Sequence, residues 1–332
     1  MTIRFIDLFC GVGGFRYAAT QAAEELGISA HCVFSSDIDK DCQDVYARNF
    51  NERPTGDITQ ILPNEIPDHD LLLAGFPCQP FSIIGNKKGF EDTRGTLFFN
   101  IASILGEKRP KAFVLENVKQ LKGHDSGRTL KRIIETLVSL DYFTTYRVFN
   151  ARDFGLPQNR ERIFIVGWKG DLDFRWPMTN VPMTPLSKIL ENNVPQDYFV
   201  SAKIREQRLK KCETANPIKP GIWHENKSGH ISVYPFSCAL RAGASYNYLL
   251  VDGIRRLTGR EMFRLQGFPE SFIVPDIYGI ARHQAGNSLP VPVAKAIIQN
   301  LISGFMPFIY QTVQPDEKSV LRVFEEGVVY GK

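Results

Sequence analysis

The stretch that decides the fold of this chain is Asp70-Leu-Leu-Leu-Ala-Gly-Phe-Pro-Cys-Gln-Pro-Phe-Ser82. Its apolar first part predicts a buried parallel strand. The residues that follow place the thiol of Cys78 on a loop at the carboxyl end of that strand. Ligands of open α/β sheets bind at this edge, and Pro77 and Pro80 restrict the backbone on both sides of the thiol. Cys78 is therefore a candidate nucleophile, and the alternative is a small buried cysteine in a proline-rich turn.

Apolar runs typical of strands alternate with helical patterns through the first half of the chain. The runs predict strands over residues 3–9, 31–35, 71–74, 112–115, 142–149 and 163–168. The patterns between them predict helices over residues 14–26, 40–49, 96–107 and 126–140, and a last helix is predicted over residues 291–301. Because strands and helices alternate, the sequence predicts an α/β fold with a doubly wound, mixed but mostly parallel sheet.

The alternation breaks near Gly170, where a region rich in Pro, Gly, Asn and aromatic residues begins. This composition, with only short extended pieces, predicts a smaller irregular domain that is mainly β. We therefore expect residues 1–172 plus 283–332 to form a catalytic and cofactor-binding domain, and residues 173–282 to form a second domain. The chain has 332 residues, which is near the size at which a single core divides.

Composition argues against several classes of protein. The six cysteines form no C-x-x-C pair and no cluster with His at metal-ligand spacing, so neither a disulfide scaffold nor a metal site is expected. The N-terminus has no signal-peptide layout, and no apolar run approaches the ~18 residues of a membrane span. We therefore expect a cytoplasmic protein without a membrane partner. The net charge of +4 is too small to indicate a nucleic-acid partner by itself.

A glycine-rich turn follows the first predicted strand. Phe5-Ile-Asp-Leu-Phe-Cys-Gly-Val-Gly-Gly-Phe15 predicts a strand that runs through this turn into a helix. Gly11, Gly13 and Gly14 would let a ligand approach backbone N–H groups, although such glycines also serve tight strand-to-helix packing. Asp37 follows the next strand, 26 positions beyond Gly11, near where nucleoside-binding folds hold a ribose diol.

Asp57 adds a carboxylate at a further strand end. A glycine turn and two carboxylates at consecutive strand ends suit a nucleoside better than a triphosphate, because the chain has no G-x-x-x-x-G-K-[ST] signature. For Asp37 and Asp57, the alternative is a role as helix N-caps.

A carboxyl group and two guanidinium groups are expected near Cys78. Glu116 lies at the end of the next strand, and adjacent parallel strands are ~4.8 Å apart. Arg160 and Arg162 alternate with Glu161 on an extended piece, so both would face one side as phosphate or carbonyl binders; a solvated edge strand is the alternative. A thiolate beside a carboxyl group suits an electrophile with a ring nitrogen, because sulfur can attack carbon while the carboxyl group binds or protonates nitrogen.

Taken together, these residues resemble the ordered motif set of the DNA (cytosine-5)-methyltransferases of bacterial restriction-modification systems. The resemblance rests on residues 5–15, 75–82, 116–118, 158–162, 256–269 and 284–288. It implies the fold of S-adenosylmethionine-dependent methyltransferases and methyl transfer from S-adenosylmethionine to C5 of a cytosine flipped out of double-stranded DNA. It also implies a monomer beside which a cognate restriction endonuclease acts separately, and it makes residues 173–282 the target-recognition domain.

The resemblance assigns catalytic and cofactor roles to matching positions. Cys78 would add to C6 of cytosine, Glu116 would hold N3 and the exocyclic amine, and Arg162 would hold O2, with Arg160 in the same catalytic set. The family usually has Glu at the position of Asp37, so we expect a ribose contact through water. The cofactor residues implied are Phe9, Gly11, Gly13, Gly14, Asp37, Ile38, Asp57, Ile58, Leu97, Asn287 and Ser288.

DNA contacts are implied for Gln79, Ser82, Lys87 and Lys88 in the loop over residues 79–89. In the recognition domain, Arg241 could read guanine through two hydrogen bonds in the major groove, although many members carry Thr-Leu where residues 239–240 are Ala-Leu. Further candidates for base or phosphate contacts, with scaffold roles as the alternative, are His224, Asn226, Lys227, His230, Tyr246, Asn247 and Tyr248.

Two rival functions remain. A tRNA-directed branch of the family shares the motif set but carries a Cys-Phe-Thr signature that this sequence lacks. A catalytically silent DNA-binding regulator would be expected to have lost Cys78 or Glu116, and this chain has both.

Overall fold

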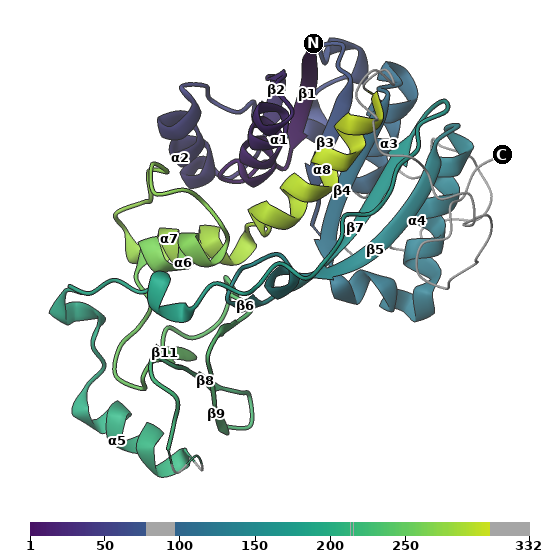
Figure 1. The fold of residues 1–332 in the computed structure, drawn as a ribbon. Helices are drawn as coiled ribbons and strands as arrows, with labels where there is room; N and C mark the ends of the chain where they lie inside the picture. The colour runs from purple at the N-terminus through teal and green to yellow at the C-terminus, as the bar shows by residue number, and fades with distance from the viewer. Residues whose placement is uncertain (78–96, 213, 215, 306–332) are drawn as a thin grey trace.

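The computed structural model describes residues 1–77, 97–212, 214 and 216–305. Its centre is a six-stranded sheet in the order β2-β1-β3-β4-β7-β5 (Figure 1). Strand β7 pairs antiparallel with both of its neighbours, and all other pairs in this sheet are parallel. The predicted mixed, mostly parallel sheet is therefore confirmed. Its strands are β1 (Thr2–Leu8), β2 (Ser29–Ser36), β3 (Leu71–Gly75), β4 (Ala112–Val118), β5 (Phe143–Asn150) and β7 (Glu161–Trp168).

The two faces of the sheet carry separate cores, because successive side chains of a strand point to opposite faces. On one face, Phe5 and Leu73 pack with helices α1 (Gly14–Glu25) and α8 (Val291–Phe305). On the other face, Leu72 and Phe113 pack with helices α3 (Leu97–Lys108) and α4 (Arg128–Ser139). Helices on both faces confirm the doubly wound architecture.

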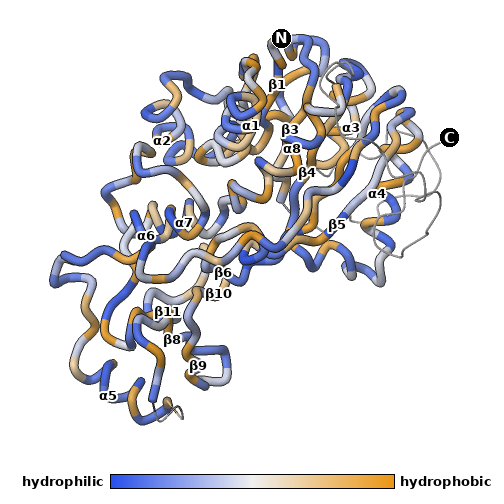
Figure 2. The backbone as a smooth tube through the Cα atoms, in the orientation of Figure 1, coloured by the Kyte–Doolittle hydropathy of each residue, from blue (hydrophilic) through white to orange (hydrophobic). Residues whose placement is uncertain are grey.

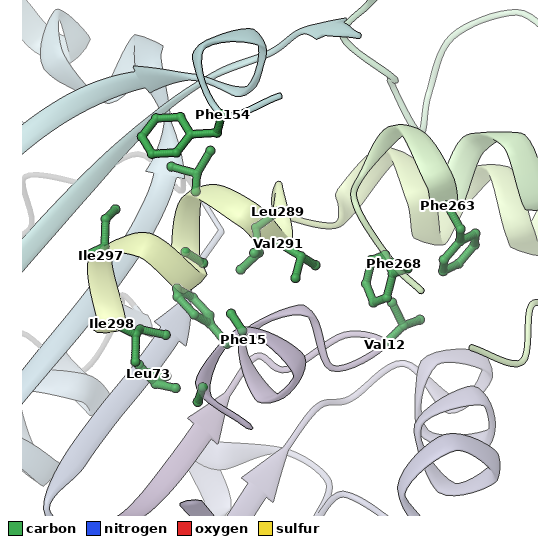
Figure 3. Packing of buried hydrophobic residues seen from close by; sticks show 14 of the residues in the cluster. Val12, Phe15, Leu73, Phe154, Phe263, Phe268, Leu289, Val291, Ile297 and Ile298 are labelled. Atoms are coloured by element: carbon green, nitrogen blue, oxygen red, sulfur yellow. The ribbon is translucent and has the colours of Figure 1, made fainter. Parts of the chain in front are cut away.

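Helix α8 ties the C-terminal part of the described chain to its N-terminal part. Figure 3 shows Leu289, just before α8, near Phe15, and Ile298 of α8 beside Leu73. A Cβ atom at Gly14 would lie only 3.2 Å from Cγ of Leu289. This packing holds the residues just before α8 beside the glycine-rich turn.

Helix α2 (Lys40–Phe50) begins after Asp39, whose side chain accepts hydrogen bonds from the backbone N–H groups of Asp41 and Cys42. Its last residue also explains one glycine of the turn. Gly13 has φ of 88°, and a Cβ atom there would lie 2.2 Å from the ring of Phe50. At Gly13, the packing alternative therefore applies.

A smaller lobe carries the irregular part of the chain. It contains a three-stranded antiparallel sheet in the order β11-β8-β9 and the helix α5 (Ala202–Lys211). Figure 2 shows that α5 is largely hydrophilic, in contrast to the hydrophobic central strands. The two-stranded parallel pair of β6 (Gln158–Asn159) and β10 (Ser237–Cys238) joins the lobe to the large domain. The three strands are β8 (Ile222–Glu225), β9 (Ile231–Tyr234) and β11 (Leu249–Val251).

Besides α5, the sequence did not predict the helices α6 (Gly259–Leu265) and α7 (Tyr278–Asn287). Helices α6 and α7 lie between the sheet and the smaller lobe in Figure 1. The rings of Phe268 and Phe272, which follow α6, lie 5.9 and 5.7 Å from that of Tyr17 on α1. This portion of residues 173–282 therefore packs against the large domain. Among the helices of the described ranges, none combines the length and apolarity that crossing a membrane requires.

Candidate active site

A cavity of about 670 Å³ opens at the carboxyl ends of β1 to β4, and we call it the strand-end cavity. Its volume lies in the range of ~300–1,000 Å³ that is usual for small-molecule sites. The edge is the one at which open α/β sheets bind ligands. Most of the predicted cofactor and catalytic residues line it: Phe9, Gly11, Gly14, Asp37, Ile38, Asp57, Ile58, Leu97, Glu116, Arg162, Asn287 and Ser288.

Other predicted site residues lie elsewhere. Gly13, Arg160 and Arg241 are absent from the lining of the cavity. The predicted nucleophile and the predicted DNA contacts of the following loop fall outside the described residues: Cys78, Gln79, Ser82, Lys87 and Lys88. Their roles stay predictions from the sequence.

Asp37 links the glycine-rich turn to the end of β2. Its Oδ2 accepts a hydrogen bond from the backbone N–H of Gly11 at 2.7 Å, and its Oδ1 accepts one from that of Asp39 at 2.9 Å. Asp39, not Asp37, is the N-cap of α2. Burial raises the pKa of Asp37, and the two backbone donors oppose that rise. Its carboxylate is thus fixed at the cavity wall.

Asp57 does act as a cap, because its Oδ1 accepts a hydrogen bond from the backbone N–H of Thr59 at 2.9 Å and begins a short 3-10 turn. The N-cap alternative therefore applies to Asp57, which also lines the cavity.

The walls of the cavity combine apolar and open surfaces. Ile38 is 72% exposed although its side chain is apolar. Phe9 adopts φ of 53°, which is uncommon for a residue with a side chain. A Cβ atom at Gly11 would meet no atom within 4 Å. The cavity therefore offers apolar side chains and free space beside the glycine turn, as a flat aromatic ligand requires.

Glu116 and Arg162 form an ion pair on neighbouring strands. Nε of Arg162 lies 2.8 Å from Oε1 of Glu116, and both side chains are largely buried. Glu116 also pairs in register with Gly75 of β3, where a Cβ atom would lie 3.6 Å from Oε2 of Glu116. Burial raises the pKa of Glu116, and the positive charges of Arg162 and Arg160 oppose that rise. The carboxyl group is thus directed toward the end of β3, three residues before Cys78.

Asn117 has a role in the site that the sequence analysis did not assign. Its Nδ2 donates a hydrogen bond to the carbonyl oxygen of Phe76 at 2.9 Å, and its side chain is almost fully buried. Its Oδ1 accepts a hydrogen bond from the backbone N–H of Val118 at 2.8 Å. Asn117 therefore fixes the backbone that leads to Cys78. Its place in the motif over residues 116–118 was the available signal.

The structure corrects the expected environment of Arg160. Its side chain is fully buried, and its guanidinium group donates hydrogen bonds to the backbone carbonyl groups of Leu240, Gly286 and Ser288. Arg160 was expected to bind a phosphate or carbonyl group of a ligand, but the carbonyl groups that it binds belong to the protein backbone. Neither the pairing with a ligand nor the alternative of a solvated strand describes this arginine, because both of its terminal nitrogens donate to main-chain atoms of distant segments, while its buried Nε has no hydrogen-bond partner among the described residues.

Residues 239–248 form what we call the recognition segment. Arg241 is exposed, and its guanidinium carbon lies 4.7 Å from the ring centroid of Tyr248. The buried Tyr248 accepts a hydrogen bond from the backbone N–H of Arg241 at 2.9 Å. Asn226 accepts hydrogen bonds from the backbone N–H groups of Ser228 and His230. In this structure Tyr248 and Asn226 support the backbone, whereas the side chain of Arg241 is accessible.

Beneath the glycine turn, Asp7 on β1 is fully buried, and its two carboxylate oxygens have no hydrogen-bond partner among the described residues. Burial raises the pKa of Asp7 well above its ordinary value, although the charge of Arg16 opposes the rise. A carboxyl group in such an environment favours its neutral form.

Comparison with known proteins shows the family to which the chain belongs. The chain is 55% identical over 293 residues to the Type II methyltransferase M.NgoBI of Neisseria gonorrhoeae, covering 88% of this chain and 90% of the relative. It is 52% identical over 317 residues to M.HaeII of Haemophilus aegyptius, covering 93% and 96%. The crystal structure of S. pombe Dnmt2 methyltransferase shares the fold, with a TM-score of 0.69 at 21% identity over 91% and 99% of the two chains.

The family model for the C-5 cytosine-specific DNA methylases matches residues 3–303, a range that includes the glycine turn, the Glu116–Arg162 pair and the segment before α8. The chain therefore belongs to the C-5 cytosine-specific DNA methylase family.

Proposed function

We propose that this protein methylates C5 of a cytosine within a specific sequence of double-stranded DNA, as the modification enzyme of a restriction-modification system. One observation carries the proposal for the site. The Glu116–Arg162 pair faces the end of β3, three residues before Cys78, on the wall of the strand-end cavity. This arrangement places a carboxyl group, a guanidinium group and the backbone leading to a thiol around one point.

S-adenosylmethionine is the cofactor that we propose for the strand-end cavity, and it supplies an electrophilic methyl group. The residues present fit its nucleoside part. The carboxylate of Asp37 suits the ribose hydroxyl groups, and the apolar Phe9 and Ile38 suit the adenine ring. Asn287 and Ser288 lie on the wall formed by the segment before α8 and would hold the methionine part.

The proposed reaction begins with Cys78. Its thiolate adds to C6 of cytosine and forms a carbon–sulfur bond, which moves an electron pair toward C5. Glu116 holds N3 and the exocyclic amine, and Arg162 holds O2, so that the charge gained by the ring is stabilised. C5 would take up the methyl group that S-adenosylmethionine supplies, leaving S-adenosylhomocysteine. A base then removes the C5 proton, and the bond between C6 and the sulfur of Cys78 breaks, which restores the thiolate. The target base must leave the duplex because none of these atoms is accessible in the stack.

Asn117 would act with these residues by orienting Phe76. The carbonyl oxygen of Phe76 accepts one hydrogen bond from Asn117 and retains a second lone pair for the exocyclic amine of cytosine.

The same proposal covers partners and domains. The smaller lobe and the recognition segment would contact DNA, with Arg241 as a base-reading residue, while the sheet carries the chemistry. The protein would act as a cytoplasmic monomer, and a cognate endonuclease would be a separate protein. Because residues after Arg256 pack on the large domain, we place the boundary of the recognition domain before α6 rather than at residue 282.

Bisulfite sequencing of DNA from a methylation-free host that expresses the chain tests this proposal. We expect 5-methylcytosine at one position of one short sequence. Cys78→Ser should abolish the signal and leave cofactor binding nearly intact, because an alcohol is a far weaker nucleophile toward C6. Cys212→Ser, in the smaller lobe, is the matched control and should methylate normally. If the host that expresses the wild-type protein in soluble form contains only unmethylated DNA, the proposed function is refuted.

A further inference from the structure

Three fully buried polar side chains meet where the large domain joins the smaller lobe. They are Gln158, Arg160 and Gln266, which we call the buried junction. Nε2 of Gln158 donates to the carbonyl oxygen of Leu265 at 2.7 Å, and Nε2 of Gln266 donates to that of Ala285 at 2.6 Å. The buried junction therefore connects β6 with the ends of α6 and α7.

Arg160 links two segments that are far apart in the sequence. Its Nη1 donates to the carbonyl oxygen of Leu240 at 2.9 Å. Its Nη2 donates to those of Gly286 at 2.9 Å and Ser288 at 2.5 Å. One planar guanidinium group thus holds the recognition segment on one side and the segment before α8 on the other. A lysine has three donors but carries them on one nitrogen atom, so it cannot place separate nitrogens against the two segments as Arg160 does.

On the recognition side, the backbone is held at consecutive residues. The N–H of Leu240 donates to Oε1 of Gln158 at 3.0 Å, and its carbonyl oxygen accepts from Arg160. The preceding strand, β10, pairs with β6. The next residue, Arg241, has its backbone N–H bound to Tyr248 and its side chain exposed. The residue predicted to read DNA is therefore attached directly to a group that Arg160 fixes.

On the cofactor side, the two segments touch. A Cβ atom at Gly286 would lie 2.4 Å from the backbone nitrogen of Ala242, so only glycine permits this approach. The next two residues, Asn287 and Ser288, line the strand-end cavity. The recognition segment and one wall of the cofactor cavity are consequently in backbone contact around one side chain.

Filling space in the core does not by itself explain why a charged side chain is buried at position 160. Burying a cation costs several kcal/mol, and the nearest compensation here is main-chain carbonyl oxygen rather than an ion pair. Within the described part of the chain, no carboxylate lies at ion-pair distance from this guanidinium group. An apolar side chain would avoid that cost but could not hold three carbonyl groups in fixed relative positions.

We infer that Arg160 is a positioning residue that couples the recognition segment to the cofactor wall, so that DNA and cofactor change each other's affinity through it. The inference rests on the proposed function. A shift of Leu240 and Ala242 on specific DNA is transmitted through the guanidinium group and through Gly286 to Asn287 and Ser288. Coupling between two sites is reciprocal, so each ligand must alter the other by the same factor.

Titration calorimetry with S-adenosylhomocysteine, the demethylated product of the cofactor, which has no methyl group to transfer, tests this inference. Its Kd is measured for the wild type and for Arg160→Lys. Each protein is titrated without DNA, with a duplex that contains the target sequence of the enzyme, and with a duplex of scrambled sequence. In the wild type, the specific duplex should lower Kd by a factor within the ~5–150-fold range of coupled sites. The ratio to compare is the Kd without DNA divided by the Kd with the specific duplex. In Arg160→Lys, this ratio should fall close to unity, while a merely structural role of Arg160 would weaken binding and leave the ratio unchanged.

The controls make the outcomes decisive. Arg175→Lys, at an exposed arginine outside both sites, should keep the wild-type ratio. If Arg160→Lys does not fold, Gly286→Ala is the second variant. It separates the same two segments while Arg160 is present, and it should bring the ratio of Kd values close to unity. A wild-type ratio of unity, or an Arg160→Lys or Gly286→Ala variant that keeps the wild-type ratio, overturns the inference. Wild-type protein that methylates DNA with a ratio of unity refutes only this coupling, whereas absent methylation refutes the proposed function.

Discussion

The strand-end cavity and the recognition segment use arginine in opposite ways. In the cavity, Arg162 is largely buried and paired with Glu116 at 2.8 Å. In the recognition segment, Arg241 is exposed, and its guanidinium group lies over the ring of Tyr248 without an ion pair among the described residues. The first side chain already has its partner, while the second keeps its donors for a partner from outside.

This difference follows from what each region is proposed to do. Stabilising charge on a bound base requires groups that are held in place before the substrate arrives, in a site from which water is excluded. Reading a base edge requires free donors on a fixed backbone, because the major groove supplies the acceptors. The backbone hydrogen bond from Arg241 to Tyr248 meets that second requirement. Substitutions in the two regions should therefore fail in different ways.

The largest effect is expected from Glu116→Gln. The amide keeps the size of the side chain but cannot donate a proton to N3, so kcat should fall by ~10²–10⁴-fold on every DNA sequence alike. Burial raises the pKa of Glu116, which keeps the wild-type carboxyl group protonated to a higher pH. The wild-type rate should decline as pH rises through that pKa, and the variant should lose this decline.

Single-turnover incorporation of labelled methyl groups across a pH series measures both effects, with S-adenosylhomocysteine affinity as the control for folding. A sequence-dependent loss of rate would place Glu116 in recognition and would break the contrast between the two regions.

A smaller effect, confined to one base pair, is expected from Arg241→Ala. If Arg241 reads guanine, the loss should be ~1–3 kcal/mol at that position and little elsewhere. Methylation rates on all single-base variants of the mapped sequence give the measurement, and Arg175→Ala serves as the exposed control. A uniform loss with a shallower salt dependence would make Arg241 a phosphate contact, and a loss of cofactor affinity would place it with the cavity.

The last effect leaves the reaction unchanged, concerns stability alone and lies beneath the cavity. The pKa of Asp7 is raised on folding, so its contribution to stability is fully present below the unfolded value of 3.8 and is lost as pH rises through the folded value. Asp7→Asn should therefore gain stability over the wild type by ~1.4 kcal/mol for each pH unit within that window.

Urea denaturation of both proteins from acid to neutral pH tests this, because the midpoint shift at constant slope reports stability. Stability curves that run parallel over the whole range would mean that Asp7 ionises in the folded protein as it does in the unfolded chain.

The sequence predicted the sheet, its two faces of helices and most of the cavity, and the family comparison confirmed the enzyme class. Local pattern suffices there, because parallel strands bring their carboxyl ends to one edge whatever the rest of the chain does. Asp37, Glu116 and the glycine turn could therefore be assigned to one site from their places after strands. The helix α6 was also within reach, since Thr258 and Glu261 form a capping box that the composition of the region obscured.

Only the tertiary structure decided what the polar side chains in the interior bind. Arg162 and Arg160 are two residues apart and look equivalent in the sequence, yet one pairs with Glu116 and the other with carbonyl groups 80 and 126 positions away. Asn117 and Phe76 are likewise 41 positions apart. A buried donor must find an acceptor, but sequence periodicity shows only that it is buried. Which acceptor it finds depends on how distant segments pack, and Arg160 shows this, because its acceptors come from both the recognition segment and the segment before α8.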